Sequence, residues 1–336
     1  MKQSFWRSCI FLLILSFVVN SSWAKNKQKA QFSWRQTGSS LALLNHEQIV
    51  WQFNHLGDGV EKGCPFFHPL ATLDGAILTD LRPDDHVWHR GLRFAWKKIN
   101  DMEGYWTWPD GQGRWPDKIM GRTEVLFAKA IPHKDYSAHF ELELSYHPPG
   151  KPAVLKETRI ISVSVPDKHG HYQIDWQGVF TAGEEDALLD RTPIPGEEGG
   201  KKWGGYAGMQ FRVSHRSNLA AWAILTSEGV EIKNTIQQKQ GLERVHGKGA
   251  RWLNLTLEFS NGKTGGVTLF GHPGNLRHPA PWHVCSMPNE LIHTPLYASP
   301  YNLKAGKKLT LQHRIIIHPG RVDKDILENQ WMDFAR

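Results

Sequence analysis

Cysteine is scarce in this chain, which has 3 cysteines among its 336 residues. Cys9 lies in an apolar segment near the N-terminus, so Cys64 and Cys285 remain for at most one disulfide. The sequence does not decide whether these two meet. It also contains no His-Glu-x-x-His motif and no closely spaced cysteine pair, which excludes the strong metal-binding signatures.

Long apolar runs are absent after the N-terminal region. Residues 9–19 form one such run; basic residues precede it, and Ser22 and Ala24 supply the small side chains that signal peptidase accepts. The run is shorter than the roughly 20 apolar residues that span a bilayer. We expect a signal peptide over residues 1–24, cleaved after Ala24, with an uncleaved membrane anchor as the alternative. The mature chain then works in the periplasm or outside the cell, away from the membrane.

Blocks of like charge and internal repeats are absent as well. The formal net charge is +7 at pH 7, and the lysines and arginines are scattered along the chain. This distribution argues against nucleic-acid binding. It fits an anionic small substrate, although ordinary solvated basic residues explain it equally well. Because no linker or low-complexity segment is present, we expect one catalytic domain over residues 25–336.

What the sequence does contain is a series of short segments in which apolar and polar residues alternate. Turn-forming Gly, Pro, Asn and Asp separate them, as is typical of antiparallel sheets. The clearest predicted strands are residues 39–44, 91–96, 138–145, 157–165, 172–181, 220–226, 252–259, 266–270 and 309–318. One helix is predicted over residues 322–335, where large apolar side chains recur at helical spacing. The predicted fold class is all-β, a large antiparallel β-sandwich with a short C-terminal helix.

Two long segments interrupt the predicted strands. Residues 105–121 carry tryptophans among Gly and Pro, and residues 183–205 are rich in Glu, Gly and Pro. Loops of this length in a compact domain are usually functional or disordered. The chain also has 15 tryptophans, most of them beside polar residues. Such rings suit stacking on sugars, while a Trp-rich sandwich core is the alternative for any single one.

A dense polar cluster, residues 84–91, directly precedes a predicted strand. Its two histidines, His86 and His89, can converge on one ligand from a loop, whereas on a strand they would point to opposite faces. Asp85 can fix the tautomer of a neighbouring imidazole. The candidates are His86, His89 and Arg90 for catalysis and Trp88 for substrate binding. Surface histidines without a role are the alternative.

A second cluster, residues 272–284, combines three histidines with an arginine and an asparagine. Its prolines remove the backbone donors that an ordinary strand needs, so a loop is expected. The candidates are His272, Asn275, Arg277, His278 and Trp282 for substrate binding and His283 for catalysis. Together the two clusters offer five histidines for a divalent metal, with His86, His89 and His283 as ligands, but no cofactor is predicted outright.

A third segment, residues 190–206, reads as a flexible arm. Its glycines resemble a phosphate-binding loop only superficially, because the segment lacks the Gly-Lys-Ser/Thr ending of such loops. Tyr206 can act as an acid or base if its surroundings lower its pKa. The candidates are Arg191, Glu198 and Trp203 for substrate binding and Tyr206 for catalysis. Alternatively, the Gly-Gly-Tyr sequence simply begins a strand over residues 207–213.

Five motifs follow one another from about Gly63 to the C-terminus: Pro65-Phe66-Phe67-His68-Pro69-Leu70, Asp85-His86-x-x-His89-Arg90-Gly91, Gly204-Gly205-Tyr206-Ala207-Gly208, His272-Pro273-Gly274-Asn275-x-Arg277-His278-Pro279 and Trp282-His283-Val284. In this order they resemble the bacterial family labelled methane oxygenase PmoA, found in secreted proteins. The resemblance implies a β-sandwich like those of aldose mutarotases and polysaccharide lyases, and a link to glycan degradation. It does not imply methane oxidation, because that subunit is an integral membrane protein. The chain departs from the family pattern at Gly271 and Cys285, where Asp and Arg are common.

Together these features predict a carbohydrate-active enzyme, a lyase or dehydratase that acts on oligosaccharides containing uronic acids. Such a reaction needs a base, a cation that binds the carboxylate and an acid for the leaving oxygen. The candidates, in that order, are His86 or His89, Arg90 or Arg277, and Tyr206 or His283. One alternative is a glycoside hydrolase with Asp85 and Glu198 as its carboxylates. Another is a non-catalytic sugar-binding module, and a mutarotase-like epimerase is a variant of the enzyme.

Overall fold

Every second side chain is buried along the two clearest strands of the structure. In β10 (Leu155–Val163) and β11 (Tyr172–Ala182), buried residues alternate with more exposed ones along the whole strand. This is the pattern of a sheet with one face on the core. The computed structural model describes residues 30–57, 64–105 and 119–336. The predicted signal peptide, residues 1–24, and most of the predicted loop 105–121 lie outside the described residues.

The described strands of the unit Gln31–Arg336 form three antiparallel sheets. The first sheet has the order β1 (Phe32–Gln36), β2 (Ser40–Asn45), β3 (Gln48–Asn54), β4 (Phe66–Leu70), β5 (Leu92–Ala95), β13 (Gly208–Arg212), β19 (Glu290–His293), β18 (Trp282–His283). The second has the order β15 (Glu231–Thr235), β14 (Leu219–Thr226), β16 (Trp252–Phe259), β17 (Thr264–Gly271), β21 (Lys308–Pro319), β11, β10, β9 (Ala138–His147), β8 (Arg122–Pro132). A small third sheet has the order β20 (Tyr301–Leu303), β12 (Ala187–Asp190), β6 (Lys98–Ile99), β7 (Met102–Glu103).

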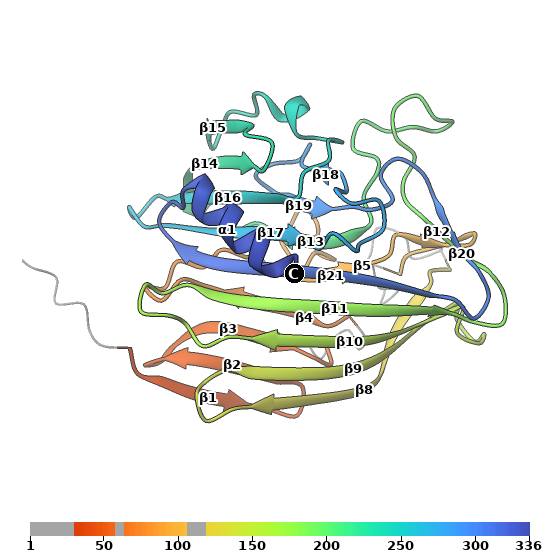
Figure 1. Cartoon of the computed structure of the whole chain (residues 1–336), viewed down its shortest axis with the longest axis horizontal. Helices are drawn as coiled ribbons and strands as arrows, with labels where there is room; N and C mark the ends of the chain where they lie inside the picture. Colours follow the sequence, from red (N-terminus) through yellow and green to blue (C-terminus); the bar gives the residue numbers. More distant parts are fainter. Residues whose placement is uncertain (1–29, 58–63, 106–118) are drawn as a thin grey trace, which may run out of the picture. The chain divides into compact units, whose positions relative to one another are not determined.

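Aromatic rings join the inner faces of the two large sheets. Phe53 on β3 lies 4.7 Å from Phe140 on β9, measured between ring centroids. Phe67 on β4 lies 6.3 Å from Trp176 on β11. Contacts of this kind fill the space between two packed sheets. The two sheets therefore form a sandwich, whose strands are drawn in Figure 1.

The helix α1 (Lys324–Phe334) packs on the outer face of the second sheet. Its Leu327 is fully buried in a cluster with Trp252, Phe270 and Ile316, which come from β16, β17 and β21. Figure 1 shows α1 crossing these strands. The helix thus uses its apolar stripe to cover part of the sheet, as the helical spacing of the sequence predicts.

The all-β class with a short C-terminal helix is confirmed. Each predicted strand overlaps an observed strand, and α1 lies within the predicted residues 322–335. The expectation of an uninterrupted loop over residues 183–205 is wrong, because β12 forms within it and pairs with β6 and β20. Four residues are too few for an alternating pattern to stand out in a sequence.

Cys64 is buried, Cys285 is half-buried, and both thiols are free. No helix of the described residues is long and apolar enough to cross a membrane.

An ion pair is buried inside the sandwich on β10. Arg159 donates to both carboxylate oxygens of Glu157, over 2.7 and 2.8 Å, and the two residues are 1 % and 2 % exposed. Tyr146 donates to the same carboxylate over 2.5 Å. The guanidinium also lies 4.7 Å from the centre of the Trp176 ring. Every oxygen of this carboxylate is therefore satisfied, which a buried charge requires.

A pair of histidines is buried between the sheets as well. His293 Nδ1 lies 3.0 Å from His313 Nε2, and both side chains are almost completely enclosed. Burial lowers the pKa of His313 from 6.5 to about 3 and holds that of His293 well below its usual range. Both rings are therefore neutral at pH 7, and in mild acid they gain a proton when the chain unfolds.

The His313→Gln variant is expected to lose part of the acid sensitivity of the fold. The unfolded chain binds a proton at His313 near pH 6.5 and the folded chain only near pH 3, so stability is complete above pH 6.5 and falls as the pH falls between these values. At pH 5 this one group costs about 2 kcal/mol relative to pH 7. Urea unfolding at pH 5 and pH 7 measures the difference in the free energy of unfolding between the two pH values. In the variant this difference should be smaller by about 2 kcal/mol than in the unmodified chain. An unchanged difference, equal to that of the exposed control His169→Gln, would contradict the assignment.

Candidate active site

A row of polar side chains lies on the outer face of the first sheet, where β5, β13, β19 and β18 are neighbours. Phe94, Met209 and Leu291 on these strands point into the core. Since adjacent residues of a strand point to opposite faces, the residues beside them point outward. This outward row consists of Arg93, Gln210, Arg212, Glu290 and His283.

Hydrogen bonds run along this row. Arg93 Nε donates to Gln210 Oε1 over 2.7 Å, and Gln210 Nε2 donates to Glu290 Oε2 over 2.6 Å. Burial by itself would raise the pKa of the Glu290 carboxyl, but the neighbouring histidines, the Gln210 hydrogen bond and Arg212 lower it to about 2. Glu290 is therefore ionised at neutral pH although its side chain is only 12 % exposed.

His89 covers this row from the loop that precedes β5. It is 4 % exposed, and burial above all lowers the pKa of its imidazole to about 3, so the ring is neutral. Arg212 Nη1 lies 3.2 Å from His89 Nδ1. Because a guanidinium can only donate, His89 Nδ1 accepts this hydrogen bond. His89 thus helps to fix the position of Arg212.

His86 stacks on His89 and is half-exposed. The ring centroids are 4.7 Å apart, and the His86 side chain is 37 % exposed. Asp85 Oδ2 lies 2.9 Å from His86 Nδ1, while Arg212 Nη2 donates to Asp85 Oδ1 over 2.7 Å. Burial opposes ionisation of Asp85, but Arg212 and His86 lower its pKa to about 2. An ionised carboxylate beside Nδ1 leaves Nε2 of His86 as the nitrogen that can exchange a proton with a ligand.

Asp85, His86, His89 and Arg212 form one connected set, called the His86 group below. Trp88 joins Tyr206 to this group. Tyr206 packs against an apolar cluster of Trp88 and Ala95, and the Trp88 ring lies 5.1 Å from that of His86. Burial raises the pKa of the Tyr206 phenol well above its ordinary value. The lowered pKa that the sequence interpretation required is therefore not found, and the hydroxyl stays protonated. Lys97 Nζ lies 5.9 Å from the centre of the same ring.

Trp203 presents an indole beside this group. It is 51 % exposed, and its ring lies 6.1 Å from that of Tyr206. The two residues after it allow the arm to fold back. A Cβ at Gly204 would lie 2.0 Å from a backbone oxygen, and Gly205 has φ +90°, a conformation that favours glycine. This requirement gives the Gly-Gly-Tyr motif a structural reason.

A third group of polar residues lies next to Tyr206, around β18. His283 is 1 % exposed, and its ring lies 5.7 Å from that of Tyr206 and 5.0 Å from that of His246. Cys285 Sγ lies 3.4 Å from His283 Nε2, and Tyr297 Oη lies 3.3 Å from His246 Nε2. Two imidazoles and a thiol are ligands that suit zinc or copper.

The expected ligand set His86, His89 and His283 does not form one cluster. Within residues 30–57, 64–105 and 119–336, the His, Cys, Asp and Glu groups at metal-ligand separation are those of His246, His283 and Cys285. His86 and His89 belong instead to the Asp85 and Arg212 network. The structure therefore splits the predicted histidine centre in two.

The loop of residues 272–279 contacts the C-terminal helix and its surroundings. His272 and His278 pack against aromatic rings of α1, and Asn275 exchanges two hydrogen bonds with the backbone of β21. Arg277 donates to backbone carbonyls of residues 295–300. These contacts give the loop a structural role, and none of them reaches the His86 group.

Other predicted site residues are held by contacts of their own. Trp282 is fully buried and donates to a backbone carbonyl over 3.0 Å. Arg90 is 1 % exposed and also donates to a backbone carbonyl over 3.0 Å. Arg191 binds Glu197 over 2.5 Å, whereas Glu198, also predicted to bind substrate, is exposed.

The sequence interpretation missed Gln210, Arg212, Glu290 and His246. Gln210 and Arg212 carry a signal, because they alternate with Met209 and Phe211 and so share one face of a strand. His246 carries none. It reaches the site through a parallel bridge to Trp282, which is 36 residues away in the sequence and therefore unpredictable from local pattern.

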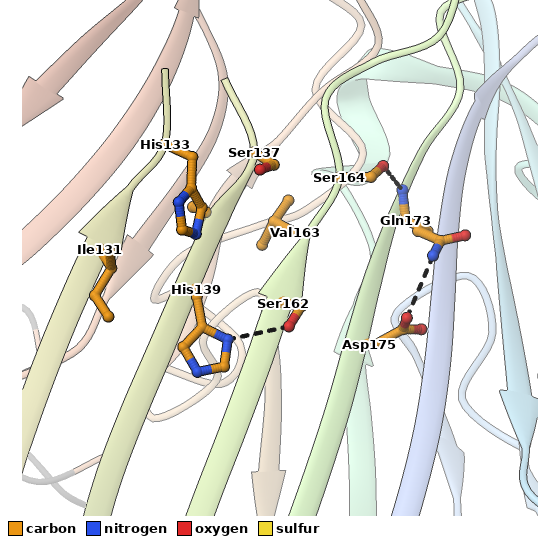
Figure 2. Close-up of a pocket in the computed structure, with 10 residues that line it drawn as sticks. Ile131, His133, Ser137, His139, Ser162, Val163, Ser164, Gln173 and Asp175 are labelled. Carbon is orange, nitrogen blue, oxygen red and sulfur yellow. Dashed lines mark hydrogen bonds between the residues drawn. The ribbon is translucent and has the colours of Figure 1, made fainter. Parts of the chain in front are cut away.

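A separate hollow of about 320 Å³ lies on the outer face of the second sheet. Figure 2 shows its polar lining, in which Ser162 and His139 share a hydrogen bond of 3.2 Å and Gln173 donates to Asp175 over 3.2 Å. The hollow is open to solvent and belongs to strands β8–β11. The His86 group lies on the other sheet and has the denser set of charged and titratable groups.

Comparison with known proteins adds one family. A model described as a family of unknown function (DUF6807) matches residues 40–332 of the chain. No curated protein matches it. The resemblance to the PmoA-labelled family stays a prediction.

Proposed function

Because the chain belongs to DUF6807, a family of unknown function, we propose its activity from the site itself: a carbohydrate lyase or dehydratase that acts outside the cytoplasm on oligosaccharides containing uronic acids. One observation carries this proposal. A half-exposed His86 backed by ionised Asp85, and a protonated Tyr206, both contact Trp88. Elimination needs a base and an acid at one site.

His86 is the proposed base. Its Nε2 would remove the proton from the carbon next to the uronate carboxylate. The electron pair of that C–H bond then forms a double bond to the neighbouring ring carbon, and the bond from that carbon to the leaving oxygen breaks. Asp85 stabilises the imidazolium that results, because its carboxylate lies 2.9 Å from Nδ1.

Tyr206 is the proposed acid. Its raised pKa keeps the phenol protonated, so it can give its proton to the leaving oxygen. This assigns to Tyr206 a role that the buried His283 is less suited for, since His283 is 1 % exposed and its Nε2 donates to the Trp203 carbonyl over 3.0 Å. The uronate carboxylate would bind near Lys97, whose buried ammonium also pairs with Glu103 over 3.0 Å, and Trp203 would stack on a sugar ring.

A glycoside hydrolase fits the described carboxylates less well. That chemistry needs one carboxyl group that is protonated near neutral pH. The pKa values of Asp85 and Glu290 are both lowered to about 2, so both groups are ionised. Glu198, the other carboxylate considered, is exposed.

The test is to incubate the purified chain with uronic-acid oligosaccharides and with neutral ones, and to follow ultraviolet absorbance and product mass. Elimination creates a conjugated double bond, so absorbance rises while the summed mass of the products equals that of the substrate. Hydrolysis adds one water and gives no chromophore. Binding without any product would support a sugar-binding module instead, and either of these last two results would overturn the proposal.

Asp85→Asn is expected to lower turnover about 10-fold, because a neutral amide stabilises the imidazolium of His86 less than a carboxylate does. KM should change little, since Asp85 supports the base and does not bind substrate. The measurement is steady-state kinetics on the uronic-acid substrate. Asp84→Asn, the same change at the exposed neighbouring residue, is the control and should match the unmodified chain. Equal effects of the two variants would count against His86 as the base.

A further inference from the structure

His246, His283 and Cys285 bring two imidazoles and a thiol together beside the proposed catalytic pair. One potential ligand atom from each lies within 4.8 Å of the other two, and Cys285 Sγ is 3.4 Å from His283 Nε2. Zinc ligands lie about 2.0–2.3 Å from the ion, so in a tetrahedral site they are about 3.3–3.7 Å from one another. The pair of Cys285 Sγ and His283 Nε2 has this separation, but Nε2 donates to the Trp203 carbonyl over 3.0 Å and has to release that bond to bind a metal. A separation of 4.8 Å has to shorten by about 1.1–1.5 Å.

Backbone pairing fixes the positions of the three residues. His283 lies on β18 and Cys285 follows two residues later, so both depend on the same short strand. His246 is joined to this strand by the parallel bridge to Trp282, and the next residue, Gly247, donates to the Trp282 carbonyl over 2.8 Å. Because backbone hydrogen bonds already hold these segments beside each other, a metal ion would not have to bring them together on binding.

Hydrogen bonds around the rings also suit a metal site. Tyr297 Oη lies 3.3 Å from His246 Nε2, and the Val284 N–H donates to His246 Nδ1 over 3.3 Å, so the ring gives up one of these two contacts when it binds a metal and keeps the other as the outer contact that orients it. His283 Nδ1 is buried and has no hydrogen-bond partner among the described residues. Since His283 is 1 % exposed, this nitrogen has no access to bulk water either. Nitrogen and sulfur donors favour zinc over magnesium or calcium.

The protonation states agree with this geometry. Burial lowers the pKa of His246 to about 4 and also lowers that of His283, so both rings are neutral and keep a lone pair at pH 7. Burial raises the pKa of the Cys285 thiol to about 11. A bound cation is what converts such a thiol to the thiolate, as zinc does in its cysteine sites.

We propose that His246, His283 and Cys285 form a zinc-binding site that leaves a fourth coordination position for water or a substrate oxygen. Three protein ligands and one open position are the arrangement of zinc sites that take part in reactions. The site is independent of the elimination chemistry proposed above, which uses His86 and Tyr206. Zinc binding can therefore be present or absent whether or not the chain is a lyase.

The test uses the full chain, freed of metal by a chelator and titrated with zinc chloride by calorimetry. We expect one equivalent to bind, and magnesium chloride to give no binding. Cobalt(II) should produce the near-ultraviolet absorption of a thiolate ligand. In Cys285→Ser the cobalt band should disappear and zinc affinity should fall by more than the roughly 10- to 100-fold that loss of an outer contact costs.

Two matched controls keep the test decisive. Cys64→Ser changes the other free thiol of the described residues and His272→Gln changes a histidine outside the group, so both variants should bind zinc like the unmodified chain. Circular dichroism of Cys285→Ser should match the unmodified protein, which excludes misfolding as the cause. His246→Gln provides a second, half-buried position. Failure to bind zinc, stoichiometric binding of copper alone, or unchanged affinity in both ligand variants would overturn the proposal.

Discussion

Tyr206→Phe is expected to lower turnover on a uronic-acid substrate by about 10²- to 10⁴-fold, the usual contribution of a positioned acid. The change removes one hydroxyl and keeps the ring that packs against Trp88 and Ala95. KM should therefore stay close to that of the unmodified chain while kcat falls. The measurement is the initial rate of absorbance increase at saturating and at low substrate concentration.

The matched control is Tyr136→Phe, which removes the same hydroxyl from a half-buried tyrosine that packs on Phe32 and Trp34. It should leave both kinetic constants unchanged. If Tyr206→Phe retains more than half of the turnover, the acid is another group. A substrate whose leaving group has a low pKa should restore the kcat of Tyr206→Phe, because such a group departs without help from an acid. That result would strengthen the assignment.

Arg159→Met is expected to lower the free energy of unfolding by about 3–5 kcal/mol, the cost of leaving a buried charge without its partner. In the variant, Glu157 would keep the hydrogen bond from Tyr146 and lose both bonds from the guanidinium. The double variant that also carries Glu157→Gln should be less destabilised than Arg159→Met alone, because the unpaired charge is gone. Urea unfolding of the three proteins measures these differences.

Arg321→Met is the control for this experiment. Arg321 also pairs with a carboxylate, that of Glu258, but the two side chains are 51 % and 39 % exposed. Exposed ion pairs contribute 0 to about 1 kcal/mol, so this variant should unfold almost like the unmodified chain. If the two arginine variants lose the same stability, burial of the Glu157 and Arg159 pair has no special cost.

Part of the candidate site could be predicted from the sequence. His86, His89, Trp88 and Tyr206 lie in motifs whose residue types suggest proton transfer, and the structure joins them in one network. The loop of residues 272–279 has equally suggestive residue types, yet its side chains pack on α1 and bind backbone groups. Composition cannot separate these cases, because the same imidazole or guanidinium can bind a ligand or a carbonyl.

Tryptophan illustrates the same ambiguity. The sequence allowed sugar stacking or a Trp-rich core for each one. Six of the largest fully buried side chains are tryptophans: Trp51, Trp96, Trp176, Trp222, Trp252 and Trp282. Trp203 is 51 % exposed and lies at the site. Flanking polar residues do not distinguish them, because on a strand the flanking residues point to the other face.

The fold class follows from the amino-acid sequence, because alternation of apolar and polar residues is a local property that requires one face of each strand to be buried. Which polar residues meet depends on the tertiary fold. Glu290 joins Gln210 across 80 residues, and His246 lies beside His283 through strand pairing. Contacts between strands depend on which strands are neighbours in the sheet and on their register. The local pattern of a single sequence does not specify these neighbours.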